Sequence, residues 1–344
     1  MPVGVREADL RDPAECARIT AFVAATDGAT PFHLPQWSRA VQEGCGQRAR
    51  YLLSEDVRGA IVGVLPLTEM RSPLFGRALV SAGFAVDGGM LGDAAAVAPL
   101  AAGAVALAQE RGCPSVEWRG GAAPAGWAVD TTSYLGFARD LAADDDAELL
   151  AIPRKQRAEV RKALAGDLTV HVARTRAAAD EHYRIYAESV RNLGTPVFPR
   201  ALFRAVLETM DADVLTVRHD GRAVASVLSL YHRGTVYPYW GGGTEAARVL
   251  RANDRMYFAL MAHARARGCT RFDFGRSKTG TGAAAFKKNW GFEGRPLSYS
   301  VWSAGERREV NPLNPRYALM VKAWRRLPLP VANAIGPWIS RGLG

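Results

Sequence analysis

The sequence contains little cysteine and no long uninterrupted apolar run. Its four cysteines are scattered without a Cys-x-x-Cys pair, so their spacing indicates neither a metal site nor a disulfide framework. No run of about 18 apolar residues is available to span a membrane. The first residues also lack the apolar segment of a signal peptide. We therefore expect a cytoplasmic chain without a metal site.

Length and charge set the next limits. A chain of 344 residues is too long for one ordinary core, which predicts two domains. The 44 lysines and arginines outnumber the 34 acidic residues and give a formal charge of +10. This excess favours an anionic partner, such as nucleic acid, a CoA-type phosphate, anionic lipid or an acidic glycan precursor. A dedicated nucleic-acid binder ranks last, because the sequence has no RNA-recognition, zinc or helix-turn-helix motif.

The predicted helices and strands occur in the same order in both halves. Each half has a strand, two helices, a hairpin, an apolar strand, a glycine-rich turn, a helix and a further strand. The second hairpin turns at Asp220-Gly221, and Asn253 is predicted as the N-cap of the helix that follows. The sequence thus predicts an α/β (α+β) fold with two mixed-sheet domains, residues 1–140 and 141–310. A basic amphipathic tail, residues 311–344, follows them.

The segment Arg271–Phe292, RFDFGRSKTGTGAAAFKKNWGF, combines three predicted pieces. They are a short strand (271–274), a loop with Arg276, Ser277 and Lys278 (275–282), and a short helix (283–290) stopped by Gly291. On spacing alone the cations are typical of a solvated basic loop. The strand, the helix and the FKKNWGF run together resemble the closing segment of the GNAT acyltransferase superfamily. The full segment is similar to the Fem branch, and more narrowly to FemAB-like proteins of exosortase/PEP-CTERM and exopolysaccharide systems.

This resemblance covers about the whole chain, with further matching motifs at Arg71–Gly76 and Arg154–Lys162. It implies two GNAT-like domains in tandem. It also implies an acyl- or aminoacyltransferase that acts on an amino group of a cell-envelope, exopolysaccharide or lipid-linked glycan precursor. The alternative is a catalytically silent adaptor that keeps the fold and binds polysaccharide machinery at the membrane surface.

The sequence leaves the donor open. Exposed amides at the start of the helix capped by Asn253 favour a phosphate, and GNAT relatives bind the pyrophosphate of CoA there. VLRAND stands where those relatives carry an Arg/Gln-x-x-Gly-x-Gly/Ala run, which puts CoA in doubt. We therefore retain both acyl-CoA and aminoacyl-tRNA as donors, and nucleic acid is a partner only for the second.

Acyl transfer to an amine needs a polarised donor carbonyl and a deprotonated amine held in line. No Ser-His-Asp or Cys-His arrangement is legible, which fits direct transfer without a covalent enzyme intermediate. The catalytic candidates are Tyr239 as general acid or positioning group, Asp273 as base with Glu245 as the alternative, and Lys287. Lys287, like Arg276 and Lys278, is expected to stabilise developing negative charge or the donor phosphate. The donor-binding candidates are Gly241, Gly242, Gly243, Arg251, Asn253, Arg276, Ser277 and Lys278. The acceptor-binding candidates are His33, Trp37, Arg71, Gly88 and Gly89, with structural roles as the competing interpretation.

Two further basic segments are ambiguous in the sequence. The helix predicted over residues 153–164 carries five cations against Glu159, which fits either a solvated face or an anion-binding face. The tail mixes arginines with tryptophans and aliphatic residues, and its three prolines exclude one long helix. It either packs against the body of the protein or lies on a membrane surface.

Overall fold

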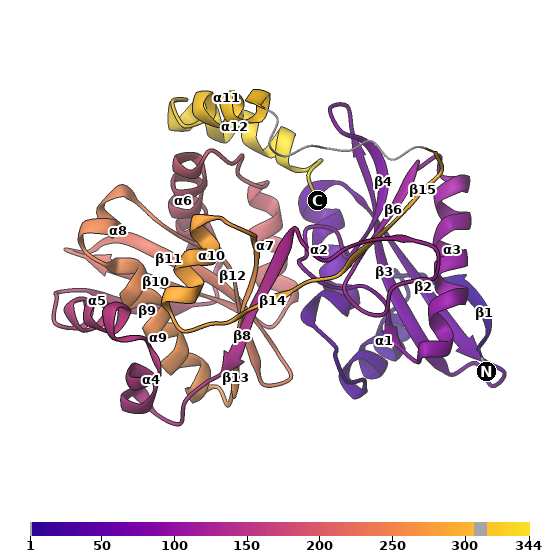
Figure 1. Ribbon diagram of the computed structural model, residues 1–344, viewed down its shortest axis with the longest axis horizontal. Helices are drawn as coiled ribbons and strands as arrows, with labels where there is room; N and C mark the ends of the chain where they lie inside the picture. The colour runs from indigo at the N-terminus through magenta and orange to yellow at the C-terminus, as the bar shows by residue number, and fades with distance from the viewer. Residues whose placement is uncertain (1, 306–314) are drawn as a thin grey trace. The chain divides into compact units, whose positions relative to one another are not determined.

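The computed structural model forms two compact units, each built on its own sheet (Figure 1). It describes the backbone of residues 2–305 and 315–344 and the side chains of residues 4–305 and 320–344. The first unit contains residues 2–131, a strand at residues 299–303 and Trp338–Gly344. The second contains residues 132–296 and the described residues up to Pro337. Residues 311–314 of the predicted tail lie outside the described part of the chain.

The first unit begins with a capped helix. Asp12 accepts a hydrogen bond from the amide of Ala14, and Pro13 is the first helical residue. The helical elements of this unit are α1 (Pro13–Ala25), η1 (Pro31–His33), α2 (Pro35–Cys45), η2 (Ala94–Ala96) and α3 (Val97–Glu110). Its strands are β1 (Pro2–Glu7), β2 (Arg48–Asp56), β3 (Ile61–Ser72), β4 (Gly76–Ser81), β5 (Leu91–Gly92), β6 (Ser115–Arg119), β7 (Ala128–Asp130) and β15 (Tyr299–Ser303).

The second unit repeats this order. Its helices are α4 (Asp145–Ala151), α5 (Arg154–Leu164), α6 (Arg176–Leu193), α7 (Arg200–Thr209), α8 (Glu245–Val249), α9 (Ala252–Ala266) and α10 (Gly282–Asn289). Its strands are β8 (Tyr134–Asp140), β9 (Thr169–Ala173), β10 (Ala212–His219), β11 (Arg222–His232), β12 (Thr235–Gly243), β13 (Arg271–Lys278) and β14 (Gly294–Pro296). The tail forms α11 (Pro315–Trp324) and α12 (Leu329–Ser340).

The two sheets have the same topology. The first has the order β1-β2-β3-β4-β6-β15-β7, and the second, written in the same direction, β9-β10-β11-β12-β13-β8-β14. In each, four antiparallel strands are followed by one short parallel pairing, β4 with β6 or β12 with β13. The next strand comes from elsewhere in the chain: β15 joins the first sheet and β8 the second. The predicted boundaries at residues 140 and 310 differ from the observed division because these strands are exchanged.

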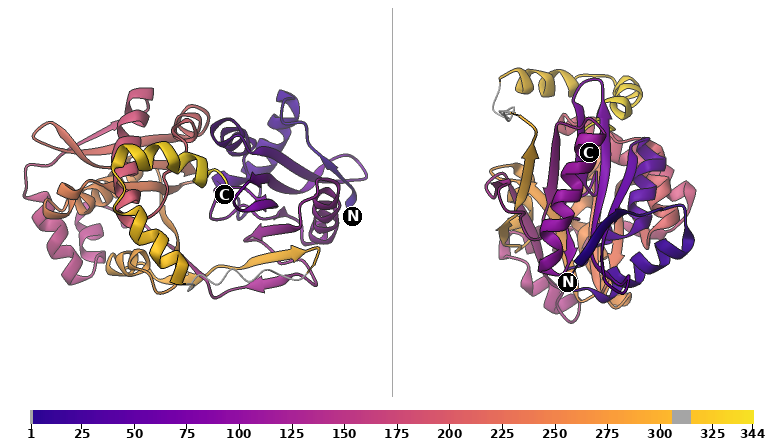
Figure 2. Two further views of the ribbon diagram at one scale, coloured as in Figure 1. Left: turned by 90° about the horizontal axis from the view of Figure 1, so that it is seen from above. Right: turned by 90° about the vertical axis from the view of Figure 1, so that its right-hand side faces the viewer.

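Helices cover both faces of each sheet (Figure 1, Figure 2). On β2, Tyr51 and Leu53 pack in one cluster with Ile19 of α1, whereas Leu52 packs in another with residues of α3. Successive strand residues point to opposite faces, so α1 and α3 lie on opposite sides of the sheet. In the second unit, α9 buries Met256, Leu260 and other apolar residues against β10 and β11.

Local signals in the sequence are confirmed at several turns. Asp220 and Gly221 both have positive φ, 49° and 73°, and connect β10 to β11 as a two-residue hairpin turn. Gly291 has φ 83° directly after α10, and the amide of Phe292 donates to the carbonyl of Lys287. The sequence therefore placed the end of α10 correctly.

Two local predictions were wrong. Helix α9 begins two residues earlier than predicted, with Arg251 rather than Asn253 in the N-cap position. Strand β13 continues to Lys278, so Arg276, Ser277 and Lys278 belong to a strand and not to a loop. Their backbone pairs with β8, a contact that only the exchanged strand provides. No helix among the described residues is long and apolar enough to cross a membrane.

Candidate active site

The centre of the second unit is the point where β12 and β13 separate. The two strands are paired in parallel only at Thr235 with Arg271 and at Val236 with Phe272. Beyond these residues β12 stays paired with β11, and β13 stays paired with β8. The carboxyl ends of two neighbouring parallel strands therefore diverge, an arrangement that opens a sheet to a ligand.

A β-bulge marks this point on β12. Leu228 of β11 opposes Trp240, whereas Ser229 opposes Pro238, so Tyr239 is an extra residue on β12. Pro238 cannot donate a ladder hydrogen bond, and the bulge accommodates it inside the sheet. Tyr239 is half-buried, with its ring edge-on to Trp240 at a centroid distance of 4.9 Å. The bulge thus places the predicted catalytic tyrosine where the two strands diverge.

A second irregularity lies opposite it on β13. The pairing with β8 shifts between Asp273 and Arg276, and Gly275 between them has φ 70°. The carboxylate of Asp273 accepts a hydrogen bond from the amide of Gly275 (2.8 Å). The carbonyl oxygens of Gly275 and Arg276, at this turn, both accept hydrogen bonds from the side chain of Lys287.

Lys287 of α10 occupies that position. Its Nζ donates to the carbonyl oxygens of Gly275 (3.0 Å) and Arg276 (2.9 Å), and it lies 5.4 Å from the ring centroid of Phe137. The residue is only 9% exposed. Burial lowers the pKa of Lys287 to about 8, with Asp273 acting in the opposite direction. An ammonium group has three N–H donors, so one remains beyond the two that hold the lysine in place.

The other predicted residues of β13 differ in their surroundings. The guanidinium of Arg276 stacks over Tyr134, 4.8 Å from the ring centroid. Ser277 is buried, and its hydroxyl has no hydrogen-bond partner among the described residues. Lys278 is exposed at the end of the strand. The structure therefore brings Asp273, Arg276 and Lys287 together around Gly275 and leaves Lys278 at the surface.

The three glycines that end β12 allow helices to approach the sheet. A Cβ on Gly241 would lie 2.6 Å from the hydroxyl of Tyr257, and one on Gly243 would lie 2.9 Å from Oδ1 of Asn253. Asn253 and Tyr257 are four residues apart on α9. The rise of a helix over four residues is close to the rise of a strand over two residues, here from Gly241 to Gly243. Gly242 faces the other side, where a Cβ would meet Ser189 of α6. Packing accounts for this glycine run, and a direct role in donor binding stays a prediction.

Tyr257 is a site residue that the sequence analysis missed. Its ring packs edge-on against Phe274 of β13 (4.7 Å between centroids), and its hydroxyl lies against Gly241 of β12. Tyr257 therefore bridges the two diverging strands. The sequence hints at Tyr257 only through its four-residue spacing from Asn253. This spacing indicates a contact with β12 only once the glycines of that strand are known to pack against α9.

The predicted phosphate site at the start of α9 has partners within the protein. Arg251 adopts φ 54°, and its guanidinium pairs with Glu159 of α5 (2.5 Å). Gln156 of α5 donates to Asp254 in the first turn of α9 (2.6 Å). Burial raises the pKa of Asp254 to about 6. A carboxylate in the first turn and an engaged arginine both oppose a pyrophosphate at this position, so the geometry does not support this part of the prediction.

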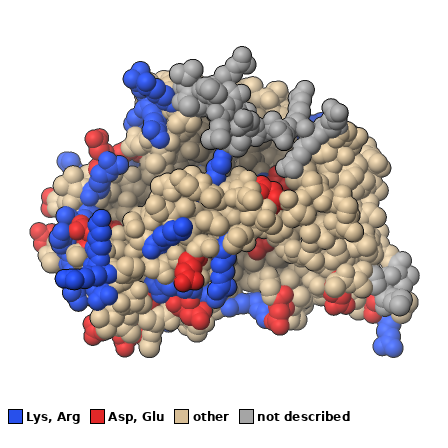
Figure 3. Space-filling model, viewed as in Figure 1, with Lys and Arg blue, Asp and Glu red and all other residues tan. Residues whose placement is uncertain are grey.

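Helix α5 keeps its other cations exposed. Lys and Arg side chains gather over this helix on the face seen in Figure 3. The exposed residues are Arg154, Lys155, Arg161 and Lys162, whereas Arg157 is half-buried and donates to the backbone carbonyls of Leu150 and Ile152. An exposed row of this kind attracts anions at long range.

The predicted acceptor residues lie in the first unit, where most are buried. Trp37 is fully buried, and its indole donates to the carbonyl of Gly83 (3.1 Å). His33 accepts a hydrogen bond from the amide of Thr30 (3.0 Å), and burial lowers its pKa to about 4, so it is neutral. His33 ends η1 and Trp37 belongs to α2, so they do not share one helix face.

The glycines of this group serve close packing. A Cβ on Gly88 would collide with Ala82, and one on Gly89 would collide with the carbonyl oxygen of Gly120. Arg71 remains half-exposed and pairs with Glu69. The structural interpretation accounts for His33, Trp37, Gly88 and Gly89, and Arg71 keeps a surface that a ligand can reach. No group of three or more His, Cys, Asp or Glu residues among the described residues is arranged to hold a metal ion.

Comparison with known proteins places this geometry in context. Residues 153–288 match the family model of the acetyltransferase (GNAT) domain. The crystal structure of FemX has a TM-score of 0.68 at 15% identity and covers 87% of this chain and 97% of its own. The C-terminal domain of a putative lysylphosphatidylglycerol synthetase from Agrobacterium fabrum has a TM-score of 0.58 at 16% identity, covering 90% and 95%. A tandem GNAT protein from the clavulanic acid biosynthesis pathway has a TM-score of 0.54 at 11% identity, covering 88% and 100%.

The comparison with curated proteins gives no match. The structural likenesses show a fold of two GNAT-like domains in tandem, as the sequence predicted. The matched family model lies wholly within the second unit, which also contains the separated strands and Lys287. Together these findings support an acyltransferase of the GNAT kind.

Proposed function

We propose that this chain transfers an acyl or aminoacyl group from an activated donor to an amine of a cell-envelope or exopolysaccharide precursor. The observation that carries the proposal is Lys287. It is a buried ammonium group beside the point where β12 and β13 separate, inside the segment that matches the GNAT domain. A buried lysine with a spare donor suits a site where negative charge develops.

In the proposed reaction the acceptor amine attacks the donor carbonyl, and a tetrahedral oxyanion forms. The third N–H of Lys287 donates to this oxyanion. Since Gly275 and Arg276 already fix the ammonium through two hydrogen bonds, the donor group needs little reorganisation during the reaction. Asp273 takes the proton that the amine loses, and Tyr239 protonates the leaving group from the bulge on β12.

Tyr257 has a positioning role in this proposal. It fills the wedge between the two strands and therefore sets the distance between the Tyr239 bulge and the Gly275 turn. A substitution of Tyr257 by Phe keeps the ring and removes the hydroxyl. If the ring of Tyr257 acts only by packing and its hydroxyl has no role, the Tyr257→Phe variant should retain full activity.

The donor remains either an acyl-CoA or an aminoacyl-tRNA. The engaged start of α9 disfavours the usual pyrophosphate position, and the exposed cations of α5 favour an extended polyanion. A lipid-linked or glycan acceptor is consistent with the likeness to FemX and to a lysylphosphatidylglycerol synthetase. We infer action at the cytoplasmic side, in an exopolysaccharide or exosortase system, from the sequence resemblance alone.

A thermal-shift series on the purified protein tests the donor first. Acetyl-CoA, longer acyl-CoAs and aminoacyl-tRNA are each titrated, and a saturable rise in melting temperature identifies the donor. Transfer of the labelled acyl group from that donor to amino-sugar acceptors is then measured. No shift with any donor contradicts the proposal and favours the non-catalytic adaptor.

Lys287→Met is then compared with Lys288→Met. The first variant removes the buried ammonium, and we expect transfer to fall at least about a hundredfold with the donor-induced shift retained. Lys288 is its exposed neighbour on α10, so the control variant should keep the activity of the unmodified protein. Equal activity in all three proteins would rule out a catalytic role for Lys287.

A further inference from the structure

Two segments of the first unit expose large apolar side chains. The turn between β3 and β4 carries Leu74 and Phe75, which are 55% and 53% exposed. The last described residues carry Trp338 and Leu343, which are 46% and 48% exposed. Single exposed apolar residues are ordinary, but four in two adjoining segments indicate an interaction surface.

A buried glutamine holds the two segments together. The side-chain amide of Gln47 donates to the carbonyl oxygens of Arg71 (3.1 Å) and Arg341 (2.6 Å), and its own oxygen accepts from the amide of Arg71 (2.9 Å). A Cβ on Gly342 would lie 3.3 Å from the ring of Phe75. The hairpin turn and the final segment therefore form one continuous surface.

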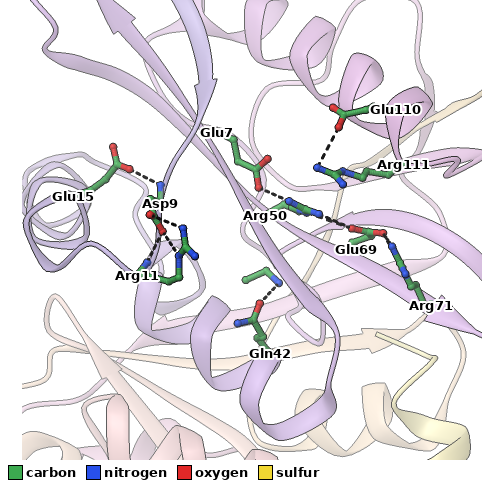
Figure 4. A network of polar contacts seen from close by, with 11 residues as sticks. Glu7, Asp9, Arg11, Glu15, Gln42, Arg50, Glu69, Arg71, Glu110 and Arg111 are labelled. Carbon is green, nitrogen blue, oxygen red and sulfur yellow. Dashed lines mark hydrogen bonds and ion pairs between the residues drawn. The ribbon is translucent and has the colours of Figure 1, made fainter.

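The charge of this surface is entirely positive. The charged residues of the two segments are Arg71, Arg77 and Arg341. Arg71 and Arg77 are 53% and 41% exposed at their side chains and pair with Glu69, which is fully buried. Figure 4 shows Arg71 beside Glu69. The buried carboxylate orients both guanidinium groups without presenting negative charge to solvent. In the chain, Arg71 and Arg77 stand on either side of Leu74 and Phe75, and Arg341 stands between Trp338 and Leu343.

Helix α12 also exposes apolar side chains. Val331, Ile335 and Trp338 are 40%, 41% and 46% exposed and follow the spacing i, i+4, i+7. Residues with this spacing lie on one helix face. The helix therefore leaves an apolar stripe uncovered and buries other residues such as Ala332 and Ser340.

We propose that Leu74, Phe75, Trp338 and Leu343, with Arg71, Arg77 and Arg341, dock on an anionic phospholipid bilayer. We call these residues the hairpin–tail surface. Exposed tryptophan and aliphatic side chains insert at the level of the headgroups, and arginines bind the lipid phosphates around them. Charge complementarity selects this partner, because each charged side chain of the surface is a cation.

The sequence offered a membrane contact only for the tail. The structure adds the β3–β4 turn, about 265 residues earlier in the chain, because Gln47 joins it to Arg341. This proposal does not depend on the proposed acyltransferase function, because no residue of the hairpin–tail surface except Arg71, an acceptor-binding candidate, belongs to the candidate active site. A membrane-bound acceptor would nevertheless be brought close to the enzyme by such docking.

Vesicle flotation of the full chain tests the proposal. Vesicles of phosphatidylcholine containing about 30% phosphatidylglycerol should carry the protein upward, and vesicles of pure phosphatidylcholine should not. The double variant Leu74→Ser/Phe75→Ser and the variant Trp338→Ser should each bind the anionic vesicles about tenfold less. Arg341→Gln should lower binding less and reduce its dependence on salt.

Val57→Ser is the matched control, because Val57 is 77% exposed on the β2–β3 turn of the same unit. It should float like the unmodified protein. Hydrogen exchange on the unmodified protein gives a second readout, with protection by anionic vesicles expected at residues 70–78 and 338–344. Failure of the unmodified protein to float, equal flotation with neutral vesicles, unchanged flotation of the two apolar variants, or protection elsewhere would each overturn the proposal.

Discussion

Each unit has a glycine in the left-handed conformation at the equivalent position of its own sheet, but the neighbouring residues differ. Gly120 follows β6 with φ 78°, three residues after the last residue of β6 that pairs with β4. Gly275 lies in β13 with φ 70°, three residues after the last residue that pairs with β12. In the first unit the carboxylate of Asp87 lies against Gly120. In the second, Lys287 bonds to the carbonyl of Gly275 and the space at its Cα stays open.

The segment that follows each glycine explains this difference. In the second unit α10 follows and delivers Lys287, whereas in the first the chain from residue 120 to β7 contains no helix. The first unit instead fills this region with Arg119, which is 4% exposed and donates to the carbonyl of Ala85. One sheet topology therefore supports a candidate active site in one unit and a closed, packed interior in the other.

The largest expected effect concerns a buried carboxylate that each unit possesses. Glu69 is fully buried among Arg50, Arg71 and Arg77, and Glu148 is fully buried between Arg139 and Arg265. Glu69→Gln and Glu148→Gln should each cost about 3–5 kcal/mol of unfolding free energy, because the mostly buried guanidinium groups of Arg50 in the first unit and of Arg139 and Arg265 in the second lose their charged partner. Urea unfolding measures the cost.

Hydrogen exchange on these two variants sharpens the comparison between the units. Glu69→Gln should increase exchange in β2, β3 and β4, and Glu148→Gln in β8 and α9, where the paired arginines lie. If both variants loosened both units alike, the two networks would not be independent supports of separate units.

The two glycines give the next effect. Gly120→Ala should destabilise the protein by about 3 kcal/mol, since a left-handed alanine is strained and its Cβ would collide with Asp87. Gly275→Ala should cost about 1 kcal/mol, because it has the same strain but no atom within reach of the Cβ. Adding Asp87→Ala should reduce the cost of Gly120→Ala. Equal costs for the two glycines would contradict the comparison.

The pH dependence of transfer tests the state of Lys287. Its pKa of about 8 means that the charged form, which binds the oxyanion in the proposed reaction, is lost as the pH rises through this value. The rate constant of the chemical step should therefore fall about tenfold per pH unit above pH 8. The residual activity of Lys287→Met should be flat over this range. A rate that rises through pH 8 would indicate that the neutral amine acts as a base.

The smallest effect concerns Asp254 at the start of α9. Its folded-state pKa of about 6 lies above the ordinary value of 3.8, so the folded state favours the protonated form. Stability is therefore lost as the pH rises through this window. Asp254→Asn should be stabilised relative to the unmodified protein by about 1 kcal/mol at pH 7, after allowance for its partial exposure. Thermal unfolding at pH 4 should show almost no difference between the two proteins.

The sequence was most informative where the chemistry is local. The turn at Asp220-Gly221 and the stop of α10 at Gly291 depend on residues with preferred φ values, and both were predicted correctly. The repeated order of strands and helices followed from hydrophobic periodicity. The start of α9 was missed because Arg251 takes a left-handed conformation and pairs with Glu159 of another helix. No local sequence pattern indicates either feature.

The candidate site was only partly visible in the sequence. Lys287 and Asp273 were named from a motif, but the two hydrogen bonds from Lys287 to backbone carbonyls depend on the shift between β13 and β8. The burial that lowers the pKa of Lys287 likewise depends on packing between elements that are separate in the chain. Tyr257 was missed because its place in the site depends on its contact with Gly241 of β12, which is distant in the chain from α9. Trp37 was named as an acceptor candidate, but the structure encloses it in the core.

By itself the sequence determined the two-domain composition, the alternation of helices and strands, the tight turns and the basic character of the chain. These properties depend on side-chain periodicity, backbone preferences and net charge, which act over a few residues or over the whole chain. Only the tertiary structure decided the exchange of β8 and β15, the separation of β12 from β13, and the joining of the β3–β4 turn to the final segment. Each of these depends on contacts between residues far apart in the chain, whose pairing no local pattern specifies.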